Sequence, residues 1–200
     1  MSPPERTTKT DVVSDFRRGQ ILEAARQNFI RHGLADTTVD AIARSAGVAK
    51  GTVYLYYKSK DEILRQLLTA DLAELHDDTV PAITADGTLE ERLRRFFAAA
   101  LGFYDRKRDF MDHCQTGMSI ELRKKARQKA GLVFAAQAEA WQAVLARHGL
   151  DRASAQATAR AVVSLAYGLS VQRLKGWHAD SVDNTVSTAT SLVLHGVMRS

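Results

Sequence analysis

Residues 38–63 read TVDAIARSAGVAKGTVYLYYKSKDEI, and this stretch decides the fold. It predicts one short helix over 39–46 and a second over 49–57. Gly47 stands between them, where a glycine permits a tight turn. Two short helices joined by such a turn, the second one basic and rich in tyrosine, have the layout of a helix-turn-helix DNA reader.

The rest of the chain is also predicted to be helical, which makes nine helices in all and no strand. Apolar residues recur every three to four positions, as they do on the buried face of an amphipathic helix. Capping residues mark two helix starts: Thr37 or Thr38 before residue 39, and a capping box over 88–91. Pro81 lies within a predicted break over 77–87. The further helices are expected over 16–32, 59–76, 88–104, 110–115, 119–148, 151–177 and 181–198.

This pattern divides the chain into three parts. Residues 1–15 are expected to be a disordered arm, because they hold two prolines and show no apolar periodicity. Residues 16–60 form the expected helix-turn-helix domain, and residues 61–200 form a larger helical body. Because 200 residues are too many for a DNA reader alone, the body is expected to have a function of its own.

The excess positive charge is concentrated beside the quoted stretch. Residues 1–60 carry ten Lys or Arg and six Asp or Glu, whereas residues 61–200 carry eighteen and seventeen. This distribution suits attraction to phosphate. No apolar run approaches the roughly 20 residues that span a membrane, and the polar start lacks a signal-peptide core. A cytoplasmic protein without membrane contact is therefore expected.

Enzymatic chemistry finds no support in the sequence. It has no metal-ligand cluster, phosphate-binding loop or Gly-x-Ser-x-Gly turn, so neither a metal nor a cofactor is expected. The one cysteine, Cys114, follows His113, but adjacent helical residues point about 100° apart and do not form a nucleophile–base pair. A buried, inert thiol is the simpler interpretation. We therefore expect a binding protein rather than an enzyme.

The chain resembles the TetR family of transcriptional regulators over residues 17–68, in the order and spacing of its residues. Beyond about residue 70 the resemblance is limited to the number and length of the helices. The matching residues are Ile21, Leu22, Ala24, Ala25, Phe29, Gly33, Thr38, Val39, Ile42, Ala43, Ala46, Gly47, Val48, Lys50, Gly51, Thr52, Val53, Tyr54, Tyr56, Tyr57, Ser59, Lys60, Ile63 and Leu64.

The resemblance implies an all-α, ligand-responsive repressor that binds a palindromic, double-stranded DNA operator as a homodimer. A small-molecule effector of unknown class would bind the C-terminal body and release the DNA. Two alternatives stay open. One is a transcriptional activator of the same fold, and the other is an all-helical interaction protein that does not bind DNA.

The expected DNA-facing residues lie on and beside the second helix of the motif. Gly51 lets the backbone approach the DNA, Thr52 offers a hydroxyl and a methyl group to a base edge, and Lys50 can reach a guanine or a phosphate. The hydroxyls of Tyr54 and Tyr56 suit phosphate oxygens. The resemblance implies a DNA-binding set of Thr38, Val39, Lys50, Gly51, Thr52, Tyr54, Tyr56 and Lys60, of which the first two touch the DNA backbone.

Several neighbours of these residues are interpreted differently. Tyr57 shares a helix face with Val53 and is expected to be core. Ala49 stands where a capping Ser or Thr is usual. Asp40 brings an acid near the DNA, where a base would help. Leu55, between the two tyrosines, is expected either to contact a thymine methyl group or to pack against the protein.

The body is expected to hold the dimer interface and the effector pocket. The resemblance implies a homodimer through the last two helices, which would place the two recognition helices about 34 Å apart. The last helix carries an apolar stripe of Val182, Val186, Ala189, Val193 and Val197, which could equally be the core of one chain. Candidate pocket residues are Phe103, Tyr104, Phe110, His113, Cys114, Met118, Gln137, Trp141 and Tyr167, and the same residue types could equally be packing.

Overall fold

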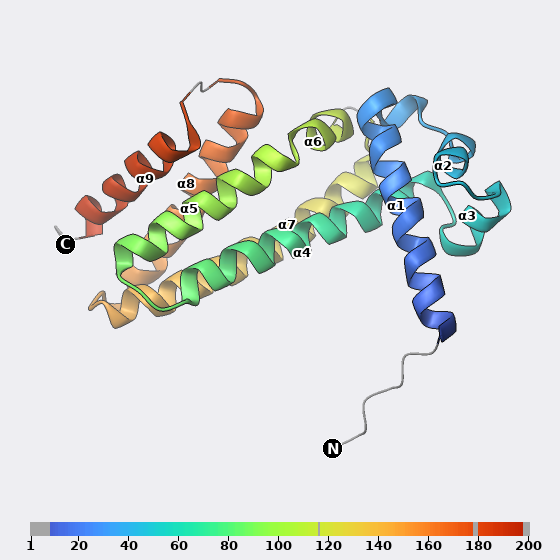
Figure 1. Ribbon diagram of the computed structural model, residues 1–200. Helices are drawn as coiled ribbons and strands as arrows, with labels where there is room; N and C mark the ends of the chain where they lie inside the picture. Colours follow the sequence, from blue (N-terminus) through green and yellow to red (C-terminus); the bar gives the residue numbers. More distant parts are fainter. Residues whose placement is uncertain (1–8, 116, 178–179, 198–200) are drawn as a thin grey trace, which may run out of the picture. The chain divides into compact units, whose positions relative to one another are not determined.

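The computed structural model describes residues 9–115, 117–177 and 180–197, and the regular structure in these ranges is entirely helical. Along them run α1 (Lys9–Asp36), α2 (Val39–Ser45), α3 (Lys50–Tyr56), α4 (Lys60–Thr84), α5 (Leu89–Arg106), α6 (Arg108–Gln115), α7 (Ile120–Arg147), α8 (Arg152–Leu174) and α9 (Val182–Val197) (Figure 1). The predicted all-α fold of nine helices is confirmed for the described part of the chain. Only α1 and α4 differ from their predicted ranges by more than a few residues.

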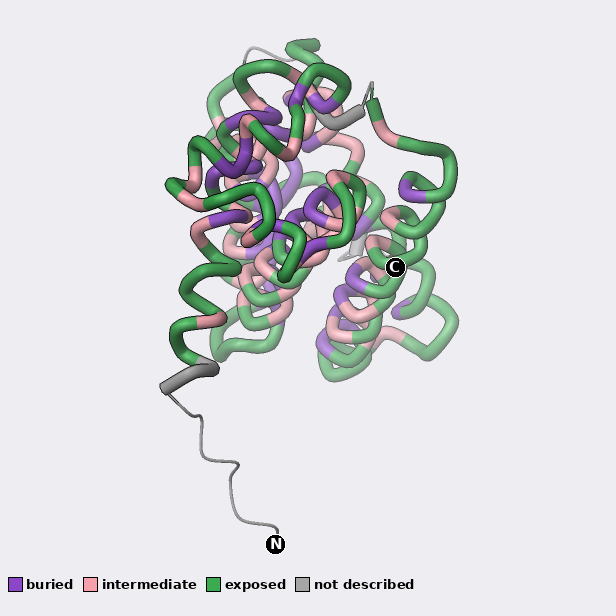
Figure 2. Tube along the Cα trace, turned by 90° about the vertical axis from the view of Figure 1, so that its right-hand side faces the viewer, coloured by how far each residue is buried: buried purple, intermediate pink, exposed green. Residues whose placement is uncertain are grey.

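The helices form two units, and both are built from separate stretches of the chain. The first unit comprises residues 1–68 and 110–123, and the second comprises residues 69–109 and 124–200. Helices α4 and α7 each contribute residues to both units. The sequence predicted one boundary at residue 60 and therefore did not assign residues 110–123 to the first unit. Along the helices, buried residues alternate with exposed ones, as amphipathic helices require (Figure 2).

The core of the first unit forms between the helix-turn-helix and the helices behind it. Its buried residues include Ile21, Ala25, Phe29, Ile42, Val53, Ile63, Leu64, Leu67, Phe110 and Leu122. The Arg26 guanidinium lies 4.4 Å from the centre of the Phe110 ring, within the range of a cation–π contact. Because burying these apolar side chains drives the packing, Phe110 and Leu122 are part of what supports the helix-turn-helix.

Polar contacts fix the corner between α1 and α2. Gly33 has a φ of 76°, a left-handed conformation that glycine adopts readily, and it interrupts the regular helix of α1. The Thr37 hydroxyl donates to the carbonyls of Asn28 and Gly33 at 3.1 and 2.7 Å. The Asn28 amide donates to the Ser45 hydroxyl oxygen at 2.9 Å. Of the two predicted candidates, Thr37 and Thr38, Thr38 caps α2, because its hydroxyl oxygen accepts from the backbone N–H three residues later.

In the second unit α5 lies against α8 and α9, around a core that contains Phe96, Phe97, Leu101, Trp141, Val144, Ala159, Val162, Val186 and Ala189. Ion pairs connect α5 to α4. The Lys107 ammonium lies 3.0 Å from Asp71 and 2.6 Å from Glu74, and the Arg106 guanidinium lies 2.6 Å from Asp78. Asp71 is buried, so its charge is compensated where water cannot reach it.

Helix α4 is longer than predicted, because the expected break over 77–87 is wrong in its first part. The helix continues through Pro81 to Thr84, and only residues 85–87 precede the cap of α5. Ile83 is fully buried in the core of the second unit. The free energy gained by burying this side chain outweighs the loss of the one backbone hydrogen bond that a proline cannot donate. Pro81 itself is exposed.

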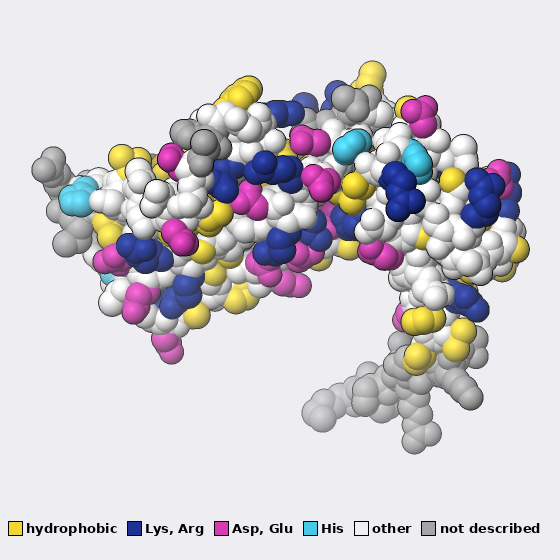
Figure 3. All heavy atoms as spheres, turned by 45° about the horizontal axis from the view of Figure 1, so that its top comes forward, with side chains coloured by type: hydrophobic (Ala, Val, Ile, Leu, Met, Phe, Trp, Pro, Cys, Tyr) yellow, Lys and Arg dark blue, Asp and Glu magenta, His cyan; other side chains and the backbone are white. Residues whose placement is uncertain are grey.

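Helix α1 also extends beyond its predicted range. It begins at Lys9, whereas the sequence predicts a disordered arm up to residue 15, so that prediction is corrected for residues 9–15. Residues 1–8 lie outside the described part of the chain. Three apolar side chains near the start of the helix, those of Val12, Val13 and Phe16, are exposed. Figure 3 shows apolar side chains at the surface of this end of the helix.

The apolar stripes of the last two helices belong mainly to the core of one chain. On α9, Val186 and Ala189 are buried, and Val182 and Val193 are partly buried at the edge of the same core. On α8, the buried residues include Ala159, Val162, Val163 and Ala166. The side chain of Val197 lies outside the described part. Of the two alternatives for this stripe, the intramolecular one holds, and a dimer through these helices would use other faces of them.

Candidate nucleic-acid interface

Helix α3, the second helix of the motif, has one buried and one exposed face. Val53 and Tyr57 are 0% and 4% exposed, which confirms the prediction that Tyr57 is core. The Tyr57 hydroxyl donates to the backbone carbonyl of Arg18 at 3.4 Å, and burial raises the pKa of this tyrosine. Tyr54 is exposed, and Leu55 is 82% exposed. The helix therefore presents its polar and aromatic outer face to solvent, as binding in a DNA groove requires.

The predicted DNA-facing residues differ in how far they are exposed. Thr38, Lys50, Gly51 and Tyr54 are exposed, and Val39, Thr52, Tyr56 and Lys60 are half-buried. The Arg18 guanidinium of α1 lies 5.7 Å from the centre of the Tyr56 ring. A cation from α1 is thus added beside the outer face of α3. Arg18 was not predicted to lie here, because no local pattern in the sequence links it to a tyrosine so far along the chain.

An ion pair joins α2 to α3. The Lys50 ammonium lies 2.8 Å from the Asp40 carboxylate, and both side chains are about half exposed. The hydrogen bond and the charge of Asp40 raise the pKa of Lys50, so the lysine stays charged. The sequence marked Asp40 as an unfavourable acid near DNA, but its ion pair with Lys50 was not predicted. The two residues are ten positions apart on different helices, where the spacing rules for one helix do not apply.

Lys60 is the first residue of α4, and its ammonium group points into the protein fold. Its ammonium donates to the backbone carbonyls of Leu34, Ala35 and Thr37 at the corner between α1 and α2. An ammonium has three N–H donors, and each of the three has a carbonyl partner here. Its charge also complements the negative end of α1. These contacts within the fold favour a structural role for Lys60 over the predicted phosphate contact.

The candidate effector residues are divided between the two units. Phe103, Tyr104, Gln137, Trp141 and Tyr167 belong to the second unit, and Phe110, His113, Cys114 and Met118 belong to the first. The Cys114 side chain lies outside the described part of the chain. Phe110 and Met118 pack in or against the core of the first unit, and His113 is exposed.

Within the second unit, polar groups from α4 and α7 meet inside the core. The Gln137 amide is buried and donates to the Thr79 hydroxyl oxygen at 2.8 Å. Trp141 lies one turn further along α7, is fully buried, and has no hydrogen-bond partner for its Nε1–H among the described residues. Such unsatisfied buried donors are rare in proteins. On α5 and α8 of the same unit, the rings of Tyr104 and Tyr167 lie 6.3 Å apart, and burial raises the pKa of Tyr104.

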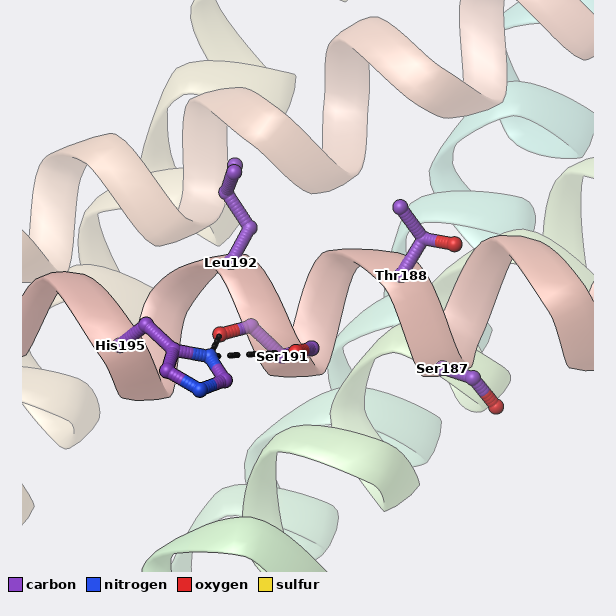
Figure 4. A pocket seen from close by; sticks show the side chains of 5 residues that line it. All are labelled: Ser187, Thr188, Ser191, Leu192 and His195. Atoms are coloured by element: carbon purple, nitrogen blue, oxygen red, sulfur yellow. Dashed lines mark hydrogen bonds between the residues drawn. The ribbon is translucent and has the colours of Figure 1, made fainter.

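A shallow groove follows the exposed face of α9 (Figure 4). It is lined by Ser187, Thr188, Ser191, Leu192 and His195. The His195 ring nitrogen Nδ1 lies 2.7 Å from the Ser191 carbonyl, to which its N–H can donate. Leu192 is 65% exposed. A second hollow of about 220 Å³ between α8 and α9 is also lined by Thr188 and Leu192.

Comparison with known proteins gives a family match in the region of this motif. Residues 21–67 match the family described as bacterial regulatory proteins, tetR family. Over 91 residues the chain is 34% identical to YhgD of Bacillus subtilis (strain 168), an uncharacterised HTH-type transcriptional regulator. This match covers 46% of the chain and 48% of YhgD. Across five curated relatives, the matched segments span 38% to 61% of their lengths.

Solved structures match over most of the chain. A TetR-like transcriptional regulator from Rhodococcus sp. RHA1 is 26% identical with a TM-score of 0.65, over 91% of this chain and 96% of that one. The regulator FadR from Bacillus subtilis, solved in complex with stearoyl-CoA, is 19% identical with a TM-score of 0.64, over 88% and 96%. At that identity the likeness to FadR shows the fold alone.

The compared proteins are transcriptional regulators, which are not enzymes, and this confirms the prediction of a non-enzymatic protein. Within the described ranges, no group of three or more His, Cys, Asp or Glu side chains is arranged to hold a metal ion. In the same ranges, no helix combines the length and the apolar character needed to cross a membrane.

Proposed function

We propose that this chain, which belongs to the TetR family of bacterial regulatory proteins, is a ligand-responsive repressor that binds a palindromic operator as a homodimer. The observation that carries the proposal is the outer face of α3, which lies within the matched residues 21–67 and presents exposed polar and aromatic side chains. Operator binding implies that the protein acts in the cytoplasm. Transcriptional activation by the same contacts is the alternative that promoter geometry would decide.

In the proposed complex, α3 enters the major groove with its first turn closest to the bases. Gly51 lets the protein backbone approach the DNA closely, and Thr52 and Lys50 contact base edges or phosphates. The hydroxyls of Tyr54 and Tyr56 bind phosphate oxygens on the flanks. At the start of α2, the capping residue Thr38 and its neighbour Val39 contact the DNA backbone. Lys60 is left out of this set, because its donors are already used within the fold.

Two-fold symmetry of the protein would match a palindromic operator. The proposed interface uses the exposed face of α9 and the adjoining hollow beside α8, where Leu192 is an apolar residue among hydroxyl groups. Interfaces commonly combine such an apolar centre with a polar rim. The buried stripes of the same two helices support the interface from within each chain.

The proposed effector site lies in the second unit, near Gln137 and Trp141. An effector releases DNA only through a difference in its affinity for the DNA-bound and the free conformations. Since FadR was solved with stearoyl-CoA, long-chain acyl-CoA is a reasonable first compound for a thermal-shift screen. A compound that binds the native state raises the apparent melting temperature by mass action.

The test of the DNA-binding role is a Lys50→Ala/Tyr54→Ala variant. We expect it to bind the DNA upstream of the protein's own gene about 10- to 100-fold more weakly than the wild type, because it loses two groove or phosphate contacts. Fluorescence anisotropy at several salt concentrations would measure both the affinity and its salt dependence. Lys58→Ala is the control, since Lys58 is an exposed lysine of the same unit outside the proposed set.

Full affinity in the double variant would refute the assignment of α3 as the DNA reader. Wild-type protein that shows no salt-dependent DNA binding at all would favour the third possibility, an interaction protein that does not bind DNA. A promoter–reporter measurement with and without the protein separates a repressor from an activator.

A further inference from the structure

The turn of the helix-turn-helix is bridged by two opposite charges. Asp40 is the second residue of α2, Lys50 is the first residue of α3, and Nζ and Oδ2 lie 2.8 Å apart. The side chains keep 52% and 50% of their surface exposed to solvent. The pair is therefore in water and accessible to another anion, and its strength is limited by solvent.

Lys50 is the only cationic residue within α3, whose sequence is KGTVYLY. The carboxylate of Asp40 therefore neutralises the one charge that this helix would bring to DNA. Carboxylates and phosphates bind an ammonium in the same way, by accepting charged hydrogen bonds from it. Asp40 and a DNA phosphate are thus alternative partners for a single group.

We infer that Asp40 is a specificity-determining residue, which holds Lys50 on an internal carboxylate and so suppresses sequence-independent binding to DNA phosphate. On an arbitrary DNA sequence, a phosphate only replaces the partner that Lys50 already has, and the freed carboxylate then lies close to the negative DNA. On the operator sequence, Lys50 contacts a base edge and the other residues of α3 make contacts of their own. These contacts favour the exchange of Asp40 for DNA as the partner of Lys50. This inference rests on the proposed DNA-binding function.

The test compares full-length wild type with Asp40→Asn, Lys50→Gln and the double variant Asp40→Asn/Lys50→Gln. Asparagine preserves the shape of Asp40 and removes its charge. Two labelled duplexes are titrated by fluorescence anisotropy over a range of salt: one of scrambled sequence, and one selected by the wild-type protein from a random pool. Asp36→Asn is the matched control, since it removes one exposed acid from the end of α1 in the same unit.

We expect Asp40→Asn to bind the scrambled duplex about 3- to 10-fold more tightly, with a salt dependence steeper by about one released counterion. The gain on the selected duplex should be smaller, so that the ratio of specific to non-specific affinity falls. Asp36→Asn should change the affinity less than about twofold, because its charge does not contact a DNA-facing lysine. Most of the gain should disappear when Lys50 is replaced by Gln.

Weaker or unchanged binding of the scrambled duplex by Asp40→Asn would overturn the inference, and weaker binding would instead make Asp40 a residue that orients Lys50 toward DNA. A gain that persists undiminished in the Lys50→Gln background would also overturn it, because it would then reflect general repulsion. If wild-type protein binds neither duplex in a salt-dependent way, the proposed function fails, and this inference fails with it.

Discussion

Lys50 and Lys60 lie ten residues apart in the chain. Each carries an ammonium group, and their different surroundings give the two groups different roles. Lys50 is held by a single carboxylate and is half exposed, so it can exchange partners when DNA approaches. Lys60 donates to three backbone carbonyls at the α1–α2 corner. Moving Lys60 to a phosphate would leave those carbonyls unsatisfied. At the scale of the residue, the partners of a charged group decide its function.

Replacing Lys60 by Met should lower stability while sparing DNA binding. The substitution keeps the length of the side chain and removes three hydrogen bonds, for a loss of about 1–3 kcal/mol. At about 2–4 °C for each kcal/mol in a chain of this size, the melting midpoint should fall by several degrees in circular dichroism. DNA affinity measured well below the midpoint should stay within about threefold of wild type.

Lys58→Met is the control for this change, because Lys58 is an exposed lysine two residues away. Its melting midpoint should match that of wild type within about a degree. If Lys60→Met melts like wild type while its DNA affinity and salt dependence both fall, Lys60 is a phosphate ligand and the structural assignment is wrong.

Local patterns in the sequence predicted the two helices of the motif and its buried face, whereas contacts across helices were not predictable. The helical repeat was enough to place Tyr57 beside Val53 in the core, and the N-cap preference narrowed the start of α2 to Thr37 or Thr38, of which Thr38 is the cap. The Asp40–Lys50 pair depends on how α2 and α3 cross, which no spacing within one helix encodes. Aromatic spacing likewise could not separate pocket from packing, because both bury rings on one helix face.

At the scale of the element, α4 shows how tertiary packing overrides a local breaker. A proline inside a helix removes one backbone donor and crowds the preceding turn. Here Pro81 faces solvent, and Ile83 on the following stretch is fully buried. Ion pairs from Asp71, Glu74 and Asp78 to α5 also hold this helix in place. A break was predicted because the proline is visible in the sequence, whereas the packing that compensates for it appears only in the folded protein.

Replacing Pro81 by Ala should therefore stabilise the protein. Alanine restores the backbone N–H and is the best helix former, which favours α4 by up to about 3 kcal/mol. Part of this gain is offset, because the unfolded chain gains about 0.4–1 kcal/mol of conformational freedom. We expect the melting midpoint to rise by a few degrees in calorimetry, with DNA affinity unchanged.

Pro81→Gly separates the two contributions. Glycine also restores the N–H but is about 1 kcal/mol worse than alanine in a helix, so its midpoint should lie below that of Pro81→Ala. Equal or lower midpoints for both variants relative to wild type would show that α4 already satisfies the carbonyl one turn before the proline, and the prediction would be refuted.

At the scale of the whole molecule, the proposed dimer depends on the outer face of α9. Leu192→Glu places a charge at the centre of the groove lined by hydroxyl groups and His195. A loss of about 2 kcal/mol at an interface centre weakens a dimer about 30-fold. Light scattering after gel filtration should therefore show monomers at concentrations where wild type is dimeric, and operator affinity should fall with it.

Leu132→Glu on α7 is the matched control, because Leu132 is an equally large and even more exposed leucine outside this face. It should remain dimeric. A Leu192→Glu variant with the mass and DNA affinity of wild type would place the interface elsewhere, and a wild type that is monomeric at all concentrations would rule out the proposed dimer.

The second stretch of the first unit, residues 110–123, limits how the DNA reader can be transplanted. Phe110 and Leu122 belong to the same core as the helix-turn-helix, although both follow the whole of α5 in the chain. A chimera that fused residues 1–68 to a foreign sensor would keep the groove-facing side chains but expose the apolar surface that these two residues cover. The portable reader of this chain is thus two pieces of sequence, and an exchange of sensors between relatives would have to carry 110–123 along with 1–68.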